Sequence, residues 1–278
     1  MNILGKYLPL KIIRITESGA YLMAGHDELE LPPTQLPEGV KEGDNISVFI
    51  YKDQTDKLCA TTKKPLALVN EAAYLTVKDN SNVGSFMDWG LVRDLLVPFR
   101  EQKDQMKVGK DYLVYVYIDE ETDRIAGSTR MNKFISNNEV KLSEGQEVEI
   151  LVCDQTDLGY NVIIENKYWG LIYKNEVFRN ISRGEKTKAY VKKIRAENKI
   201  DISLQKQGYD EVSSASDQIM DKLVKNQGFL SLNDKSDPKD IYKELQMSKK
   251  TFKKATGWLF RNRKIEITDE GLKLISED

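Results

Sequence analysis

The sequence contains few of the residues that build disulfides and metal centres. Its 278 residues include two cysteines, Cys59 and Cys153, and a single histidine, His26. The cysteines lie far apart in strand-like segments, which argues against a structural disulfide, and a structural zinc site usually needs about four close ligands. One histidine excludes a multi-histidine metal centre and leaves little for histidine-based acid–base catalysis. We therefore expect no metal site and no cofactor.

Neither charge nor hydrophobicity is concentrated enough to indicate a membrane protein or a strongly basic chain. The formal net charge is -2 at pH 7, so any attraction for nucleic acid must come from local clusters. No segment approaches the roughly 18 uninterrupted apolar residues of a membrane span. The opening MNILGKYLPLKIIRI is not typical of a signal peptide, because Lys6, Pro9 and Lys11 interrupt its apolar run. The composition predicts a cytoplasmic globular protein with no membrane partner.

Three segments of the chain share one hairpin pattern. They read GDNISVFIYKDQTDKLCATTKKP, GKDYLVYVYIDEETDRIAGSTRM and GEKTKAYVKKIRAENKIDISLQK, and they begin at Gly43, Gly109 and Gly184. Each has a glycine turn, an alternating strand, a polar turn and a second strand. The second strand of each segment begins with the same kind of triplet: Asp or Asn, then Lys or Arg, then Leu or Ile. The three triplets start at Asp56, Asp123 and Asn198. This recurrence indicates an internal repeat.

Upstream of each hairpin lies another pair of strands around a glycine–aromatic corner. The three corner segments are KIIRITESGAYLMA, AYLTVKDNSNVGSFMDWG and EVEILVCDQTDLGYNVIIENKYWG. Each repeat therefore has about five short strands over roughly 60 residues, the size of a small Greek-key barrel of OB type. We expect a mainly β fold with three tandem five-stranded OB barrels over residues 1–66, 67–142 and 143–210. Closure of each barrel would remove its exposed sheet edges.

From about residue 212 the sequence changes to helical spacing. Phe229 marks the exit of a first helix, Asp237 followed by Pro238 begins a second helix, and Ser248 caps a third. KIEITDEGLKLI then predicts a short hairpin. Three helices followed by such a wing predict a winged-helix domain over 211–278. The residues expected to face inward are Ile219, Leu223, Ile241, Tyr242, Leu245, Phe252, Ala255 and Leu259.

Several segments resemble a known family. GSFMDWGLVRDLLVP, VYIDEETDRIAGS and SKKTFKKATGWLFRNRKIEIT are similar to the CvfB/YitL family of bacterial RNA-binding proteins, which carry tandem S1-type domains and a C-terminal winged helix. The resemblance covers nearly the whole chain and is clearest in the second repeat and the tail. It implies RNA binding and post-transcriptional regulation, and it implies no catalytic residue. The first repeat departs most, since AGHDELELPPTQLP lacks the Gly-Leu and the basic residue that stand at Gly90-Leu91 and Arg93.

Aromatic and basic residues of the repeats are the candidate RNA contacts. OB barrels stack bases on exposed rings while cations follow the phosphates, and each stacked base is worth about 1–3 kcal/mol. The resemblance to S1-type domains implies that the aromatic residue after the glycine corner faces the ligand, and it assigns this role to Tyr21, Phe86 and Tyr160. Trp89 and Trp169, each followed by glycine, would extend these platforms. The candidate cations are Arg14, Arg93, Arg124, Arg130, Lys167, Lys188 and Lys192.

The stretch NVGSFMDWGLVRDLLVP, residues 82–98, divides into a ligand face and a core face. We expect Phe86, Trp89 and Arg93 to face the ligand, because Trp89 stands in a turn-like context that favours exposure. The alternative is that these strand aromatics are ordinary core residues. The residues expected in the core are Leu91, Leu95 and Val97.

A dense cluster of one charge sign marks the third predicted helix and the residues after it. Such a cluster attracts phosphates and makes binding fall steeply with salt. A winged fold normally offers this helix to a groove of nucleic acid, so the cluster predicts nucleic-acid contact rather than only a solvated face. We expect Trp258 to pack between helices. The cluster consists of Lys249, Lys250, Lys253, Lys254, Arg261, Arg263 and Lys264.

The leading hypothesis is a non-catalytic protein that binds single-stranded RNA, and alternatives stay open. A DNA-binding regulator would bind duplex nucleic acid through the winged helix. An adaptor would dock its tail on an acidic RNA-processing or ribosomal protein. The acidic run Asp119-Glu120-Glu121 with Asp123 could be interpreted as a metal-dependent nuclease site. Adjacent acids at a hairpin tip usually splay into water, however, whereas metal sites need convergent ligands from several elements.

Overall fold

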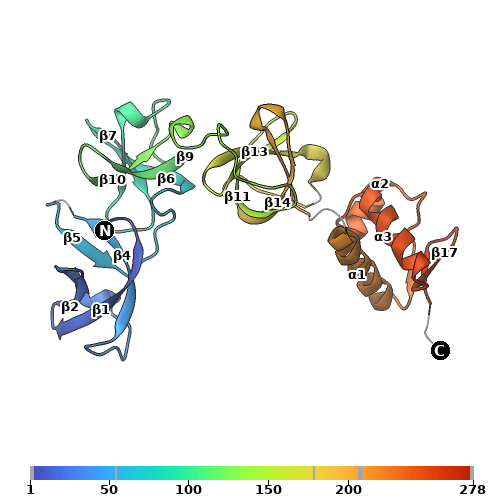
Figure 1. Cartoon of the computed structure of the whole chain (residues 1–278), viewed down its shortest axis with the longest axis horizontal. Helices are drawn as coiled ribbons and strands as arrows, with labels where there is room; N and C mark the ends of the chain where they lie inside the picture. Colours follow the sequence, from blue (N-terminus) through green and yellow to red (C-terminus); the bar gives the residue numbers. More distant parts are fainter. Residues whose placement is uncertain (1–2, 54, 178, 206–208, 276–278) are drawn as a thin grey trace. The chain divides into compact units, whose positions relative to one another are not determined.

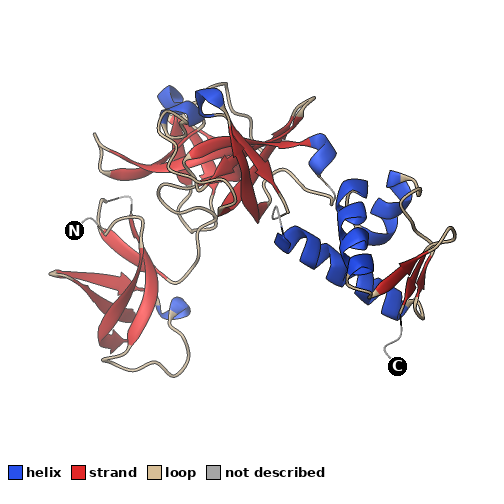
Figure 2. Cartoon of the chain, turned by 45° about the vertical axis from the view of Figure 1, so that its right-hand side comes forward, coloured by secondary structure: helices blue, strands red, loops and turns tan. Residues whose placement is uncertain are grey.

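The computed structural model describes residues 3–53, 55–177, 179–205 and 209–275, with the side chains of 209–213 excepted. It divides into two units, Met1–Ile135 and Ser136–Asp278. The first unit contains two five-stranded sheets, and the second contains a five-stranded barrel and a helical part with a small sheet (Figures 1 and 2). The predicted mainly β fold with a C-terminal α+β part is confirmed. The division into four domains stays a prediction.

The three repeats form three sets of five strands. The first set is β1 (Tyr7–Thr16), β2 (Gly19–Ala24), β3 (Asp27–Leu31), β4 (Asn45–Lys52) and β5 (Leu58–Thr61). The second set is β6 (Ala72–Asn80), β7 (Gly84–Asp88), β8 (Leu95–Pro98), β9 (Asp111–Asp119) and β10 (Arg124–Ser128). The third set is β11 (Glu147–Gln155), β12 (Gly159–Ile164), β13 (Tyr168–Tyr173), β14 (Lys186–Ile194) and β15 (Ile200–Ser203).

Each set curls into a barrel, but only the third is closed by strand pairing among the described residues. The first two sheets have the equivalent orders β3-β2-β1-β4-β5 and β8-β7-β6-β9-β10. Their outer strands, β3 with β5 and β8 with β10, lie next to each other without a ladder between them. In the third set β13 pairs in parallel with β15 and completes the ring. The first two barrels therefore keep a seam between two edge strands.

The predicted glycine corner recurs in all three barrels because the third strand leaves no room for a side chain. An added Cβ would approach a carbonyl oxygen of that strand to between 1.9 and 2.3 Å, closer than any real contact. The three glycines are Gly19, Gly84 and Gly159. Each hairpin tip likewise has a residue with positive φ, which Asp and Asn tolerate better than most side chains. These residues are Asp56, Asp123 and Asn198.

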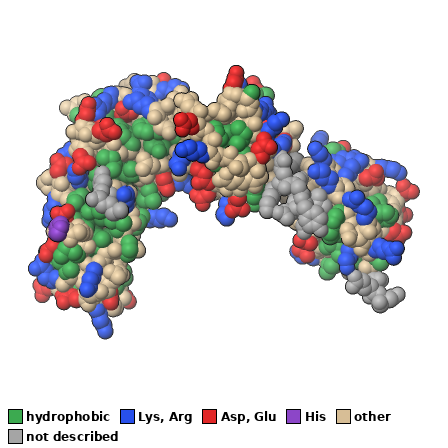
Figure 3. Space-filling model, in the orientation of Figure 1, with side chains coloured by type: hydrophobic (Ala, Val, Ile, Leu, Met, Phe, Trp, Pro, Cys, Tyr) green, Lys and Arg blue, Asp and Glu red, His purple; other side chains and the backbone are tan. Residues whose placement is uncertain are grey.

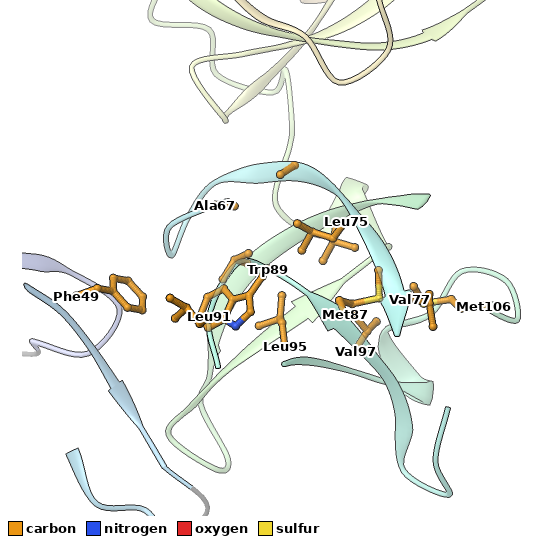
Figure 4. Close-up of a cluster of buried hydrophobic side chains, with 13 residues drawn as sticks. Phe49, Ala67, Leu75, Val77, Met87, Trp89, Leu91, Leu95, Val97 and Met106 are labelled. Carbon is orange, nitrogen blue, oxygen red and sulfur yellow. The ribbon is translucent and has the colours of Figure 1, made fainter. Parts of the chain in front are cut away.

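One side chain joins the first two barrels. In β4, Val48 and Ile50 point into the first barrel, so Phe49 between them must point out of it. Phe49 is nevertheless fully buried, because its ring packs edge-to-face on Trp89 of the second barrel with the centroids 5.8 Å apart (Figure 4). Tyr7 packs against the same ring. The core of the second barrel thus extends into the first.

The other two barrels carry an aromatic residue at the position equivalent to Phe49 and cover it differently. Tyr115 in β9 stacks on Phe134 of the segment that follows the second barrel, with ring centroids 4.4 Å apart. Tyr190 in β14 stays half-buried, and its hydroxyl donates to the carboxylate of Glu147 at 3.1 Å. Of these three outward rings, only Phe49 is therefore covered by a neighbouring barrel.

The C-terminal part has the predicted helices and wing. Its elements are α1 (Tyr209–Lys225), β16 (Phe229–Leu230), α2 (Pro238–Leu245), α3 (Lys249–Arg261), β17 (Ile265–Ile267) and β18 (Leu272–Leu274). The side chains of Asp237 and Ser248 cap α2 and α3 by accepting from the backbone N–H groups of Lys239 and Thr251. Every residue expected to face inward is buried except Tyr242, which is half-buried, and Trp258 packs against the core. None of the helices whose residues are described is long and apolar enough to cross a membrane.

We predict that Phe49→Ala destabilises the first unit far more than Phe99→Ala does. Truncating a buried phenylalanine costs about 3–5 kcal/mol. Phe99 is 54% exposed, so its truncation should change the unfolding free energy by less than about 0.5 kcal/mol. Urea unfolding followed by tryptophan emission measures both, since Trp89 reports directly on the Phe49 contact. Equal effects of the two changes would contradict a core shared by the two barrels.

Candidate nucleic-acid interface

A groove of about 480 Å³ lies in the first unit where the second barrel meets the first. Strands β7, β8 and β10 of the second barrel line it, and the first barrel contributes Tyr51 and Lys52. Apolar lining comes from Leu96, Ile125 and Ala126. Small-molecule sites usually occupy about 300–1,000 Å³, so the groove can hold a ligand the size of a nucleotide.

Phe86 enters this groove from β7. Its neighbours Ser85 and Met87 are buried, so the alternation of the strand turns Phe86 to the opposite face, where it is half-buried. Leu96 lies opposite Phe86 on β8 and also lines the groove. A partly exposed ring at such a position can stack on a flat base.

Arg93 is a groove cation that no carboxylate of the described residues pairs with. Its guanidinium donates to the backbone carbonyl of Lys52 at 2.6 Å, and the side chain is half-buried. A neutral carbonyl fixes the guanidinium in place without cancelling its charge. Arg93 therefore stays able to form a charge-assisted bond with a phosphate beside Phe86.

Arg124 lines the same groove, but its guanidinium is engaged in an ion pair that links the two barrels. It forms two hydrogen bonds of 2.7 Å with the carboxylate of Asp56, the tip residue of the first hairpin. Lys52 of the first barrel reaches the equivalent tip residue Asp123 at 2.5 Å. The bonds from Arg124 hold the pKa of Asp56 below its usual value. The equivalent hairpins of the first two repeats are thus linked by two reciprocal ion pairs.

The acidic run at the second hairpin is held in structural contacts. Asp119 is buried and accepts hydrogen bonds from the backbone N–H and hydroxyl of Thr122 and from Arg100. Arg100 also pairs with Glu121 at 2.6 Å. Burial alone would raise the pKa of Asp119, but the bonds from Thr122 and Arg100 hold it below its usual value. Across the described residues, no group of three or more His, Cys, Asp or Glu side chains is placed to hold a metal ion.

Trp89 is buried, and the expectation that it is exposed is wrong. Only 3% of its surface is accessible, and its indole N–H donates to the backbone carbonyl of Arg93 at 2.5 Å. The turn-like sequence favours exposure only while the second barrel is considered alone, because Phe49 of the first barrel covers the ring. The expected core residues of this stretch are confirmed as buried: Leu91, Leu95 and Val97.

Trp169 does not occupy the place of Trp89, although a glycine follows both. Trp89 comes after β7 in a turn where Gly90 has a φ of 87°. Trp169 lies within β13, paired with Ile163, and is half-buried. Its backbone N–H and carbonyl are both bonded to the side chain of Asn137. The two tryptophans therefore do not form equivalent platforms.

The strand register separates Tyr160 from the other two corner aromatics. Tyr21 and Phe86 each stand two residues after the corner glycine, opposite the residue that follows a β-bulge. Tyr160 follows its glycine directly, so Asn161 takes the register position of Phe86. Because side chains alternate, this difference of one residue turns Tyr160 to the other face, where it packs against the core of the third barrel. The expected equivalence of the three rings is wrong for Tyr160.

Tyr21 keeps the outward position in the first barrel, and a cation already covers its ring. The guanidinium of Arg14 lies 4.1 Å from the ring centroid and is 3.6 Å from the carboxylate of Glu28. In the third barrel a comparable pair is Arg195 over Tyr173, at 5.3 Å, and the sequence pattern did not single out either residue.

The predicted cations of the third barrel are paired with acids. Lys188 lies 2.7 Å from the carboxylate of Glu147, which raises the pKa of Lys188 above its usual value, and Lys192 pairs with Glu176. Lys167 is exposed. In the second barrel, exposed Arg130 donates through Nε to the carbonyl of Arg100 at 2.9 Å. None of these cations lines the groove around Phe86.

Three residues near the groove were missed by the sequence pattern. Tyr51 and Arg100 line it, and exposed Phe99 directly precedes Arg100 in the short 3-10 helix η2 (Phe99–Glu101). The aromatic–arginine pair right after a strand was a usable signal for Phe99 and Arg100. Tyr51 had none, because it belongs to the other barrel.

Helix α3 carries cations that are free of acidic partners. Lys249 donates to the carbonyl of Ser236 at 2.8 Å, and Lys253 is 4.0 Å from the carboxylate of Asp234. Lys264 is exposed at the start of the wing. Figure 3 shows Lys and Arg side chains over this helical part of the surface. The cations of this cluster with no carboxylate partner among the described residues are Lys249, Lys250, Lys254, Arg261 and Arg263.

Two segments of the chain match protein-family models. Residues 217–274 match the CvfB-like winged helix domain, and residues 4–63 match the S1 domain. The S1 match falls on the first barrel, whose corner sequence departs most from the other repeats. Over nearly its full length the chain is similar to the uncharacterized protein YitL of Bacillus subtilis, with 28% identity over 94% of this chain and 90% of that protein. Conserved virulence factor B of Staphylococcus saprophyticus is 24% identical over 96% of this chain and 92% of that protein.

The resemblance to the CvfB/YitL family is therefore confirmed over nearly the full length of the chain. A crystal structure of a multidomain protein with nucleic acid binding domains from Streptococcus pneumoniae covers 98% of both chains, with 24% identity and a TM-score of 0.41. The matched S1 and winged-helix domain types indicate nucleic-acid binding, and neither is a catalytic domain type.

We predict that Asp119→Asn destabilises the first unit at neutral pH, whereas Glu120→Gln, at the exposed neighbour, has little effect. Losing the charge-assisted bonds of a buried carboxylate should cost about 1–3 kcal/mol. Because the folded-state pKa of Asp119 is lowered, its contribution is present above the unfolded-state pKa and is lost as the pH falls through the folded-state pKa. Urea unfolding at neutral and acidic pH should therefore show a gap that closes in acid. A gap of constant size would contradict this role.

Proposed function

We propose that this protein is a non-catalytic RNA-binding protein that holds single strands. A base would stack on Phe86 in the groove of the first unit, and Arg93 would bind an adjacent phosphate. The cations of α3 would bind further phosphates of the same RNA molecule. Once the groove holds the RNA, its effective concentration near α3 is raised, and this strengthens the overall binding. The observation that carries the proposal is the partly exposed ring in a groove of nucleotide size, beside an arginine that has no carboxylate partner among the described residues.

The charges of the groove favour entry of a base over a long run of phosphates. Asp94, Asp119 and Glu121 line the groove together with its cations. These carboxylates are paired, Asp94 with Lys78 and the other two with Arg100, so the groove keeps little net charge for a run of phosphates, whereas a neutral base needs none. Only an unpaired base has a free ring face to offer, because the bases of a duplex are already stacked on both sides. The groove is therefore suited to a nucleotide turned out of a single strand.

Binding without chemistry would regulate transcripts by shielding them or by presenting them to other factors. The family relationship supports this role, which we place in the cytoplasm. An RNA-processing or ribosomal protein would be a natural partner for RNA held in this way.

We predict that Phe86→Ala weakens binding of oligouridine RNA about 5- to 150-fold, the equivalent of one stacked base worth about 1–3 kcal/mol. Phe86→Tyr keeps the ring and should bind like the original protein; a tyrosine already stands at the equivalent position in the first barrel, Tyr21. Fluorescence anisotropy with labelled RNA measures both variants. Unchanged affinity of Phe86→Ala would remove the stacking site from the proposal.

We predict that the double change Lys250→Ala and Lys254→Ala weakens the salt dependence of binding. For single strands each lost phosphate contact should reduce the slope of log affinity against log salt by about 0.7. The control is the double change Lys199→Ala and Lys235→Ala, at exposed lysines that already pair with Glu197 and Asp269. It should leave the slope nearly unchanged.

The same titrations separate the alternatives. Tighter binding of duplex DNA than of RNA, lost with Lys250 and Lys254, would indicate a DNA-binding regulator. An equal, weak affinity of all variants for RNA would leave the adaptor function.

A further inference from the structure

Gly257 in the middle of α3 has no structural reason to be glycine. Of the glycines in the described part of the chain, every other one either has a positive φ or would bring an added Cβ into a clash of less than 3 Å. Gly257 has helical geometry, and a Cβ there would meet nothing within 4 Å. Glycine in a helix interior is less favourable than alanine because it loses more backbone entropy on folding. The fold would therefore be better served by alanine at this position.

Gly257 lies at the centre of the basic side of α3. Lys253 and Lys254 stand four and three residues before it, and Arg261 stands four residues after it, so all share one side of the helix. The Nε of Arg261 donates to the carbonyl of Gly257 at 3.2 Å, which keeps the guanidinium along this side. The opposite side is buried in the core through Phe252, Ala255 and Leu259.

We propose that Gly257 is the point at which the sugar-phosphate backbone of RNA comes closest to the main chain of α3. This inference rests on the function proposed above. It adds a contact whose strength depends on how closely the RNA backbone approaches α3. Without a Cβ, a phosphate can settle between Lys253, Lys254 and Arg261. A methyl group would hold the strand away and lengthen all three ionic contacts together, and Coulomb energy falls with distance.

The chemistry of this side favours contacts that do not depend on the base sequence of the RNA. At the positions around Gly257 it carries Lys250, Lys253, Lys254, Arg261 and the exposed ring of Phe260, and no amide or carboxylate group. Contacts from such cations to phosphates fix the position of a strand without reading its sequence. A ring stacks on any base without reading its identity. The contact at Gly257 should therefore serve RNA strands of different sequence equally.

The test compares Gly257→Ala with the unchanged full-length chain, using oligouridine and oligoadenine RNA of equal length. Thermal unfolding is followed by the helical circular dichroism signal, since α1, α2 and α3 all lie in the C-terminal part. We expect Gly257→Ala to raise the melting temperature of the helices, because alanine is the better helix former. We expect its affinity for both RNAs to fall by the same factor, about tenfold. The matched control is Val224→Ala at an exposed position of α1, which should also raise the melting temperature but leave binding unchanged.

Each outcome bears on a different claim. If Gly257→Ala binds normally while the double change at Lys250 and Lys254 weakens binding, the inference about Gly257 fails and the proposed function stands. If neither variant weakens binding, the contact of α3 with RNA fails as well. Unequal losses for the two RNAs would assign the site to bases and overturn the backbone contact. A joint fall of melting temperature and affinity would show that the glycine serves the fold, and it too would overturn the proposal.

Discussion

The burial of Phe49 against Trp89 organises the first unit. Strand alternation places Phe49 on the outside of its own barrel, where an unprotected ring would face water. Covering it takes a second barrel, and the tryptophan that covers it becomes core at the same time. The contact also brings the end of β4, with Tyr51 and Lys52, beside the strands that carry Phe86. The groove has its observed form because two residues of the first barrel complete a lining that otherwise belongs to the second.

The cations of the chain divide into those that hold the fold and those that remain available. Arg100, Arg124, Lys188 and Lys192 face carboxylates at close range. A cation paired in this way attracts a phosphate weakly, because the phosphate must compete with an acid already in place. Cations without a carboxylate partner among the described residues lie at many surface positions, such as Arg130 and Lys167, but Arg93 and α3 place them at the proposed contacts. Affinity for a polyanion should depend on these few positions rather than on the net charge.

Much of the fold was predictable because its signals are local. Period-two alternation and the recurring glycine corner indicated three barrels, and capping residues indicated the helices of the winged part. Each of these signals acts within a few residues and needs no partner from elsewhere in the chain. The candidate site was less predictable. Phe86 and Arg93 were identified from their own stretch of sequence. Tyr51 could not be identified, because no residue near it in the sequence indicates that it lies beside the second barrel.

The sequence by itself determined which segments form strands, corners, caps and helices, since backbone sterics and side-chain periodicity decide these within each segment. Only the tertiary structure decided that Trp89 is buried, that Tyr160 turns away from the position of Phe86, and that Arg124 binds Asp56. Burial depends on what covers a residue, a one-residue change of register reverses the direction of a side chain, and an ion pair needs its partner within a few ångströms. All three depend on contacts between segments that lie apart in the chain.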